Sequence, residues 1–394
     1  MLNKKFNVGI LGATGAVGQN YALLLEDHQW FNITYLAASQ KSAGKSYEDA
    51  VRGKWFMDRD IPKSLKNIVL GDASKVEEAI GKCDFVFSSY EGTKEDIQKT
   101  EMDYASADMP VVSNNSAHRW TEVPMIIPEI NSNHTYLITT QQKNRNFKKG
   151  FVVTKPNCSI QSYLTPIHAL MKEDYIPQRI IVSTEQALSG AGYPGVASLD
   201  IVDNVIPFIN GEDEKTEREP LKILGYLTKD KKIINPNIKI SATCTRVPVT
   251  DGHLAIVNLE FGDKKPESLD EIIDIWDKFS AVPQMLELPS APKRPIIYRY
   301  EENRPQPRKD RNSDKGMTVS VGRLRKCDVL DIKFVGLSQN TIRGAAGGAI
   351  LTAPFDNLLV TIYVMRIVSA FLFILLAWLG YRSIPERYKS LFFL

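Results

Sequence analysis

Cysteine is scarce in this chain of 394 residues, and its four cysteines form no pattern typical of a metal site or a disulfide framework. No CxxC pair and no cluster of cysteine with histidine is present. Structural zinc sites need thiolate and imidazole ligands at short spacing, and disulfide-stabilised proteins need paired cysteines. We therefore expect no metal ion, no disulfide and a reducing compartment, the cytoplasm.

An excess of charge of one sign is also lacking. The chain has 49 Lys and Arg against 46 Asp and Glu, a formal net charge of +3, and the basic residues are dispersed. Because nucleic-acid-binding proteins usually carry a basic patch or stripe, we expect small-molecule partners and no nucleic acid. The length and the 43% of hydrophobic residues predict a globular chain of two to three domains. The residues before Val8 lack the cleavage site of a secretory signal.

One long apolar run lies near the C-terminus, over residues 358–379, with Arg366 inside it. About 20 apolar residues suffice to cross a bilayer, but an arginine near the centre costs roughly 2.5 to 3.5 kcal/mol. Arg382, Arg387 and Lys389 follow the run. We expect a membrane partner only if this segment is a genuine anchor.

The first third of the sequence alternates short apolar runs with helix-like stretches, an order typical of parallel α/β folds. Helices are predicted at residues 15–28 and, behind the N-cap Ser74, at residues 74–81. The predicted strands are residues 7–11, 34–38, 68–71, 85–88 and 111–113. We predict a doubly wound sheet of the Rossmann type.

A second domain is predicted after a strand at residues 151–154. Longer strands follow, some with alternating apolar and polar residues, at residues 180–185, 238–242, 254–261 and 329–337. This pattern indicates an α+β domain with a mixed sheet.

The first strand runs into Gly12-Ala-Thr-Gly15-Ala-Val-Gly18 and then a helix. Glycines at such a turn let the backbone approach a pyrophosphate, whose charge is held by N–H groups and the positive helix end. An ordinary strand-to-helix turn is the alternative, but the position at the first strand favours a dinucleotide.

No Asp or Glu ends the second predicted strand, where an NAD-selective site usually binds the ribose hydroxyls. Residues 37–45 instead offer the hydroxyls of Ser39 and Ser42 and the cation of Lys45. These donors favour the 2′-phosphate of NADP, with a plain polar loop as the alternative.

Cys158 follows the strand at 151–154 and precedes a predicted helix at residues 159–172, so its thiolate would be stabilised by the helix start. Pro166 inside that helix predicts a kink or an early break. The other three cysteines are expected to be buried and inert. Of the five histidines, His253 is notable because it follows a turn and opens a strand, but sequence distance alone cannot pair it with Cys158.

Seven ordered motifs between residue 7 and about residue 353 resemble aspartate-semialdehyde dehydrogenases of the fungal and archaeal branch. The motifs are Gly12-Ala-Thr-Gly-Ala-Val-Gly-Gln19, Ser42-Ala-Gly-Lys45, Asn157-Cys158-Ser159, Gln186-Ala-Leu-Ser-Gly-Ala-Gly-Tyr193, Arg246-Val-Pro-Val-Thr-Asp-Gly-His253, Arg304-Pro-Gln-Pro-Arg308 and Asn340-Thr-Ile-Arg-Gly-Ala-Ala-Gly347.

The resemblance implies a catalytic set. Cys158 would attack aspartyl phosphate and form a thioester, with His253 as acid/base and Gln186 orienting the acyl group. Hydride from NADPH would then yield aspartate semialdehyde, for methionine, threonine and isoleucine biosynthesis, with lysine left open.

The resemblance also implies the binding residues. Arg246 would hold the substrate carboxylate, Glu212 its ammonium and Lys215 its phosphate, with help from Arg119 and Asn115. The implied cofactor-binding residues are Gly12, Thr14, Gly15, Ala16, Val17, Ser39, Ser42, Lys45, Ser89, Ser189, Gly190 and Asn340.

The family pattern implies a homodimer or homotetramer and four segments. These are an NADP-binding domain at 1–156, a catalytic and dimerisation domain at 157–338, a helix returning to the first domain at 339–353, and an atypical apolar tail at 354–394. Because Pro354 ends the resemblance, the tail is a gene-model artefact, an anchor or an interaction helix.

Two other functions stay open. A malonyl-CoA reductase of the same fold would share the nucleophile, the base and the cofactor, but its substrate has no ammonium group for Glu212 to bind. A membrane-tethered, inactive homologue acting as a binding protein is the other alternative, against which the intact catalytic motifs weigh.

Overall fold

The computed structural model of the chain describes residues 5–353, and the apolar run at 358–379 lies outside the described residues. Within residues 5–353, no helix is both long enough and apolar enough to span a membrane. Two six-stranded sheets organise this part of the chain.

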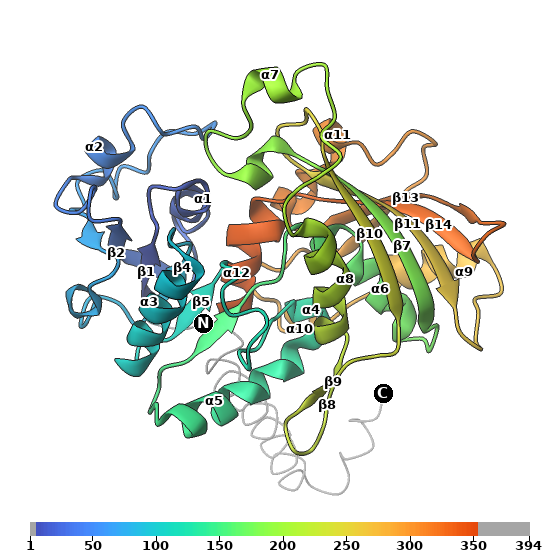
Figure 1. The fold of residues 1–394 in the computed structure, drawn as a ribbon, viewed down its shortest axis with the longest axis horizontal. Helices are drawn as coiled ribbons and strands as arrows, with labels where there is room; N and C mark the ends of the chain where they lie inside the picture. The colour runs from blue at the N-terminus through green and yellow to red at the C-terminus, as the bar shows by residue number, and fades with distance from the viewer. Residues whose placement is uncertain (1–4, 354–394) are drawn as a thin grey trace, which may run out of the picture. The chain divides into compact units, whose positions relative to one another are not determined.

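The first sheet, at the left of Figure 1, is built from parallel strands only. Its order is β3(Gly71–Asp72), β2(Phe31–Ala38), β1(Phe6–Leu11), β4(Phe85–Ser88), β5(Val111–Ser113) and β6(Val152–Thr154). The strands alternate with helices such as α1(Ala16–Leu24) and α3(Lys94–Ser106), and most strand residues are buried because helices cover the sheet. The predicted doubly wound Rossmann-type sheet is confirmed.

Two predicted elements of this domain are shorter than expected. The strand predicted at 68–71 is reduced to β3, which begins only at Gly71. The helix predicted at 74–81 is the single 3₁₀ turn η1(Val76–Glu78). Ser74 does not cap it, because its hydroxyl and its N–H both donate to Oδ1 of Asp72, at 2.7 and 3.0 Å.

The second sheet is mixed, with the order β10(Lys239–Arg246), β7(Pro177–Gln186), β11(His253–Phe261), β14(Ile332–Ser338), β13(Val319–Lys326) and β12(Ile296–Arg299). Strand pairs β10–β7 and β12–β13 are parallel and the others antiparallel. The strand predicted at 329–337 starts only at Ile332, because a turn in which the Cys327 N–H donates to the Asp331 carbonyl precedes it.

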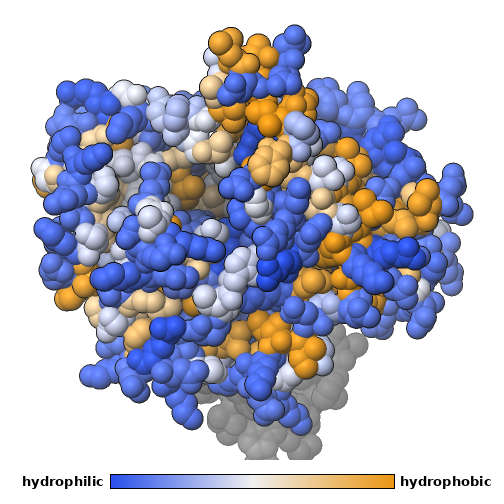
Figure 2. Space-filling model, viewed as in Figure 1, coloured by the Kyte–Doolittle hydropathy of each residue, from blue (hydrophilic) through white to orange (hydrophobic). Residues whose placement is uncertain are grey.

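One face of the mixed sheet is covered and the other is open. Ile180 and Val182 of β7 are buried in the core beside α6(Leu164–Met171) and α9(Leu269–Lys278), whereas Ile181 between them is 45% exposed. Ile256 of β11 is also exposed. Figure 2 shows hydrophobic side chains gathered over the flank formed by β10 and β7.

The helix predicted at 159–172 is broken in two. The 3₁₀ helix η3(Ser159–Ser162) ends at Tyr163, whose φ of −138° is not helical, and α6 starts after it. Pro166 therefore lies in the first turn of α6, where its missing N–H costs no hydrogen bond and the helix needs no kink.

The last described elements lie between the two sheets (Figure 1). The π-helical turn η6(Ile342–Ala346) contacts α1 and η3, and α12(Gly347–Thr352) contacts β5. The segment at residues 342–352 therefore joins the Rossmann-type sheet to the loop that carries Cys158.

The remaining elements are α2(Tyr47–Val51), α4(Pro128–Asn131), η2(Ser132–Tyr136), α5(Leu137–Arg145), η4(Leu188–Ala191), α7(Ser198–Ile201), α8(Glu212–Ile223), β8(Tyr226–Leu227), β9(Ile233–Ile234), α10(Val282–Met285), α11(Pro307–Asp310) and η5(Ser313–Gly316).

Candidate active site

Cys158 and His253 are in contact although they are far apart in the sequence. Cys158 lies between β6 and η3, and His253 is the first residue of β11, after a turn in which Gly252 has φ 99°. The Sγ of Cys158 is 3.2 Å from Nε2 of the fully buried His253. The pairing that sequence distance left open is therefore made by the fold.

The hydrogen bonds around His253 indicate where its proton is. The backbone N–H of Ala187 donates to Nδ1 of His253 at 3.0 Å, so a neutral ring carries its proton on Nε2, facing Cys158. The Cys158 thiol in turn donates to Oδ1 of Asn157 at 3.4 Å. Burial and then the neighbouring Arg246 lower the pKa of His253 to about 3. The pair is thus a neutral imidazole donating to a sulfur.

The Cys158 thiol is harder to ionise than the sequence suggested. Burial and then Glu212 raise its pKa to about 11, against the opposing effects of Lys155, Arg119 and Arg246. The long helix predicted to follow Cys158 is only the four-residue turn η3, which offers a weaker dipole. The groups that favour the thiolate are therefore nearby cations rather than a long helix.

Glu212, the first residue of α8, is a hydrogen-bonding centre beside Cys158. Its Oε1 accepts from Nζ of Lys215 at 2.9 Å, and its Oε2 accepts from Nδ2 of Asn157 at 2.6 Å and Nε2 of Gln186 at 3.0 Å. Burial tends to raise the pKa of Glu212, but Lys215 and these hydrogen bonds hold it below its usual value. A buried carboxylate is thus maintained next to the nucleophile.

Arg246 ends β10 directly beside Gln186 of β7. It is buried, and its Nη1 donates to the Ala187 carbonyl at 2.7 Å. A Cβ at Gly190 would lie 2.8 Å from Nη1 of Arg246 and 3.0 Å from Nε2 of His253, so the backbone of Gly190 lies directly against both side chains. The loop at residues 189–190 therefore covers both side chains.

Asn340 ties that loop to the turn before His253. Its Oδ1 accepts from the Gly252 N–H, and its Nδ2 donates to Oγ of Ser189, both at 2.8 Å. Ser189, Gly190 and Asn340, which the family pattern places beside the cofactor, thus lie together near His253.

The guanidinium of Arg119 is occupied by the protein itself. Nη1 binds Oε1 of Glu219 at 3.0 Å, Nε donates to the Lys155 carbonyl at 2.9 Å, and Nη2 donates to the Asn114 carbonyl at 3.1 Å. These three bonds use three of the five N–H groups of the guanidinium and fix its orientation, and one N–H group on each of Nη1 and Nη2 is left for a further contact.

Asn115 is likewise bound within the first domain. Its Nδ2 donates to Oε1 of the buried Glu101 at 2.8 Å and to Oγ of Ser88 at 3.3 Å. Both N–H groups of the Asn115 amide are thus engaged within the first domain.

The glycine-rich turn has the geometry that a dinucleotide phosphate needs. Gly12 has φ 81°, and a Cβ there would lie 2.3 Å from the Ser89 carbonyl oxygen. The helix α1 begins at Ala16 with Gly15 as its N-cap, without a side-chain cap and without an acidic residue in its first turn. Together with the half-buried Thr14 and Val17, this turn leaves backbone N–H groups for a phosphate.

The loop after β2 presents the predicted 2′-phosphate donors. Ser39 and Lys45 are exposed and Ser42 is half-buried. The Ser42 N–H donates to the Ser39 carbonyl at 2.8 Å, which folds the loop into a turn. These residues fit the phosphate that distinguishes NADP from NAD.

Asn157 and Glu219 take part in this site but were not singled out from the sequence. The Oε2 of Glu219 accepts from the Asn157 N–H at 2.6 Å, and Glu219 is fully buried. The available signal was the spacing, because Glu212 and Glu219 are seven residues apart and so lie on one face of α8.

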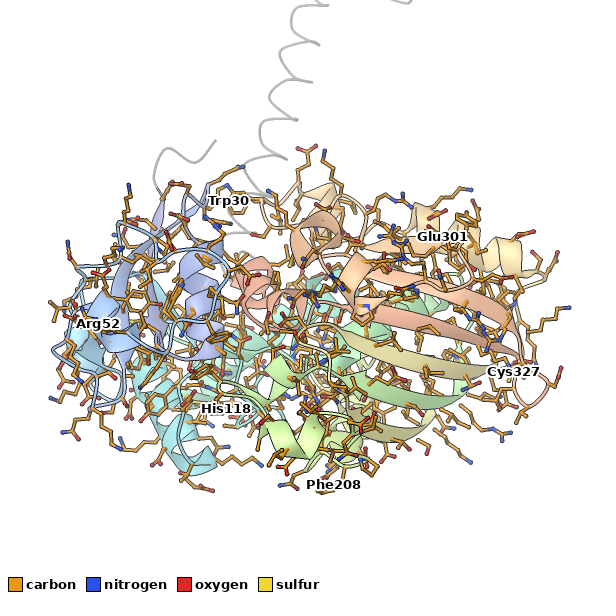
Figure 3. The ribbon with its side chains drawn as sticks, turned by 90° about the horizontal axis from the view of Figure 1, so that it is seen from above. Trp30, Arg52, His118, Phe208, Glu301 and Cys327 are labelled. Atoms are coloured by element: carbon orange, nitrogen blue, oxygen red, sulfur yellow. The ribbon has the colours of Figure 1, made fainter. Side chains whose placement is uncertain are left out.

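The other three cysteines lie outside this cluster. Cys244 is buried, with its Sγ 3.5 Å from Oγ1 of Thr216, and Cys83 is half-buried. Figure 3 shows Cys327 at the end of the mixed sheet that is remote from the Rossmann-type sheet.

Comparisons with known proteins agree with this architecture. Residues 7–138 match the family described as semialdehyde dehydrogenase, NAD binding domain, and residues 167–343 match semialdehyde dehydrogenase, dimerisation domain. An aspartate-semialdehyde dehydrogenase from Aspergillus fumigatus is 43% identical, covering 89% of this chain and 96% of the relative. One from Methanothermobacter thermautotrophicus is also 43% identical, covering 89% and 99%.

A solved structure supports the same assignment. The crystal structure of aspartate-semialdehyde dehydrogenase with NADP from Candida albicans is 35% identical, with a TM-score of 0.80, and the match covers 89% of this chain and 98% of that one. The chain therefore belongs to the aspartate-semialdehyde dehydrogenase family.

Proposed function

We propose that the chain reduces L-aspartyl 4-phosphate to L-aspartate 4-semialdehyde with NADPH and releases phosphate, in the biosynthesis of methionine, threonine and isoleucine. The observation that carries this proposal is the 3.2 Å contact between Cys158 Sγ and His253 Nε2, with Glu212 and Arg246 close by. A nucleophile and a proton donor thus lie beside one anion and one cation.

The first half-reaction belongs to Cys158. The thiolate attacks the acyl carbon, the C–S bond forms, and the C–O bond to phosphate breaks with its electron pair leaving on phosphate. Nε2–H of His253, which faces the sulfur, is placed to donate to the carbonyl oxygen as negative charge develops there.

NADPH, held at the Gly12–Gly15 turn with Ser39, Ser42 and Lys45 around its 2′-phosphate, would supply the hydride for the second half-reaction. His253 then stabilises the oxygen of the reduced adduct, and the C–S bond breaks to release the aldehyde and return the thiolate. The hydrogen bond between Asn340 and Ser189 keeps the loop at residues 189–190 over the imidazole ring of His253 during both half-reactions.

The charged side chains of the site are complementary to the three charged groups of the substrate. Arg246 offers a guanidinium for the carboxylate, Glu212 a carboxylate for the ammonium, and Lys215 an ammonium for the phosphate. Arg119 contributes through an N–H group that its protein partners do not use, and the Asn115 amide contributes after exchanging one of its present bonds. An anion maintained at Glu212 supports an amino-acid substrate over malonyl-CoA, which has no ammonium group to bind it.

The proposal also covers the oligomeric state of the chain. The matching family domain over residues 167–343 is a dimerisation domain, and the open face of the mixed sheet supplies exposed Ile181 and Ile256 for it. We propose a homodimer through this face, with a homotetramer as the higher assembly, and a cytoplasmic location. We further propose that the first domain ends at residue 156 and that residues 339–353 return to it, as the contact of η6 with α1 supports.

The test is an assay of the full chain in the reverse direction. With aspartate semialdehyde, NADP⁺ and phosphate, we expect phosphate-dependent NADPH formation, followed by absorbance. Cys158→Ala should abolish it, because no thioester can form, while Cys327→Ala at the remote end of the mixed sheet should retain it. A folded wild-type chain that forms no NADPH would contradict the proposal.

A further inference from the structure

Lys155 is a buried cation three residues before the nucleophile. Its side chain is 2% exposed, and among residues 5–353 its Nζ has no hydrogen-bond partner. The half-buried Lys222 differs, because its Nζ donates to three backbone carbonyls at 2.9 Å each. Because an unpaired buried ammonium is costly, the position of Lys155 calls for a physical explanation.

Two glycines place Lys155 and Cys158 along the same face of the terminal helical segment. A Cβ at Gly344 would lie 2.8 Å from the Cβ of Cys158, and a Cβ at Gly348 would lie 2.4 Å from Cε of Lys155. Gly344 lies in η6 and Gly348 in the following helix α12, four residues further along the chain. The lysine stem and the cysteine therefore both pack against the continuous segment formed by η6 and α12.

The space around Lys155 is too small for a ligand. The cavity lined by Lys155, Gln161 and Arg343 has a volume of about 10 Å³, and a single water needs about 10 to 15 Å³. A substrate or cofactor group therefore cannot enter from this side to pair with the ammonium.

The other buried cations near Lys155 already have carboxylate partners. Arg119 pairs with Glu219 at 3.0 Å, and Arg343 pairs with Glu129 at 2.9 Å. Among the charged groups that act on Lys155, Arg119 and Arg343 oppose its protonation, whereas Cys158 and Glu219 favour it. Since Glu219 is shared with Arg119, an ionised Cys158 is the anion left for Lys155.

His253 does not supply the positive charge that the thiolate needs. Its Nδ1 accepts the Ala187 N–H, so its neutral form is the one that the site favours. The neutral ring can donate a hydrogen bond to the sulfur but cannot neutralise it. Glu212 on the other side of Cys158 adds repulsion.

We infer that Lys155 is a positioning residue that supplies the counter-charge for the ionised Cys158, an inference that rests on the proposed nucleophilic role of Cys158. As the thiol loses a proton and the Lys155 amine gains one, a thiolate–ammonium pair forms without any change in the net charge of the buried site. Burial lowers the pKa of Lys155 to about 7, so both its amine and its ammonium form are present near neutral pH. When the C–S bond of the adduct breaks, the same ammonium stabilises the leaving thiolate.

The test measures the reactivity of Cys158 in the full chain and needs no substrate. In Lys155→Met, which keeps the length of the side chain without its charge, we expect iodoacetamide to alkylate Cys158 about tenfold more slowly than in the wild type between about pH 7 and 9, because a nearby opposite charge lowers a thiol pKa by about 1 or more. Peptide mass spectrometry reads Cys158 separately from the other cysteines. The control is Lys99→Met, because Lys99 pairs with Asp103 on the exposed surface of α3, and this substitution should leave the rate unchanged within about twofold.

A second measurement keeps the inference testable if Lys155→Met fails to fold. Because coupling between two titrating groups is reciprocal, Cys158→Ser should lower the pKa of Lys155, read by NMR of lysine labelled at Cε. An alkylation rate equal to the wild type in folded Lys155→Met, or a Lys155 titration unaffected by Cys158→Ser, would overturn the inference. Failure of the semialdehyde assay would instead contradict the proposed function and leave these two readouts standing.

Discussion

At the scale of single residues, one backbone hydrogen bond determines how the Cys158–His253 pair works. The amide of Ala187 occupies Nδ1 of His253 and leaves the proton on Nε2, where it faces the sulfur. A cysteine paired with a protonated histidine has a depressed pKa. In this chain the neutral form of the histidine is favoured, and burial raises the pKa of the cysteine instead of lowering it.

The pH dependence of Cys158 reactivity follows from this state. Because burial raises the pKa of the thiol to about 11, we expect its alkylation by iodoacetamide to keep rising with pH between about pH 7 and 9. Rates measured over this range by peptide mass spectrometry, with Cys158→Ser as the blank, check the slope. A plateau reached below about pH 8 would show that the thiolate already dominates at neutral pH, against the prediction.

At the scale of elements, α8 braces the site through one of its faces. Glu212 at its start holds Asn157, and Glu219 two turns later holds the Asn157 N–H and Arg119. Lys222 near its end donates to the carbonyls of Arg119, Thr121 and Val123. One helix thus sets the position of the residue before the nucleophile.

Removal of the Glu219 charge should loosen this brace. Glu219→Gln leaves Arg119 as a buried cation without its carboxylate, and breaking a buried pair in this way costs about 3 kcal/mol of unfolding free energy. Unfolding by denaturant measures this loss of unfolding free energy. The control on the same helix is Glu214→Gln, because the pair of Glu214 with Arg218 is exposed and should cost less than about 1 kcal/mol. Equal effects of the two substitutions would contradict the role of α8.

At the scale of the whole molecule, no helix or strand among residues 5–353 covers the second face of the mixed sheet. Helices α6 and α9 bury Ile180 and Val182, while Ile181 and Ile256 are exposed on the opposite side. An exposed apolar face on a domain of this size is typical of an interface, and the family domain that matches here is a dimerisation domain.

A charge placed on this face should separate the subunits. We expect Ile181→Asp to sediment as a monomer at concentrations where the wild-type chain is a dimer, because the carboxylate would be buried without a partner at the interface. Val329→Asp is the control, since Val329 is 86% exposed in a turn outside the sheet face. An unchanged sedimentation coefficient for Ile181→Asp would place the interface elsewhere.

Much of the fold was predictable because its signals are local. Apolar runs, glycine turns and their order along the chain predicted the Rossmann-type sheet, the Gly12–Gly15 turn and the mixed sheet. The errors occurred where side chains compete with the backbone, as at Ser74, which binds Asp72 instead of capping a helix. The position of the helix break at Tyr163 was not predicted, although Pro166 had indicated a kink or an early break in that helix.

The sequence by itself determined which chemical groups are present, namely a thiol, an imidazole, the Glu212 carboxylate and the Arg246 guanidinium, together with their order in the motifs. It did not determine their protonation or their partners, because burial and hydrogen bonding depend on residues distant in sequence. Only the tertiary structure shows that the Ala187 amide donates to His253 and that Arg119 and Asn115 bind protein partners. It also shows that, among residues 5–353, the buried Nζ of Lys155 has no hydrogen-bond partner.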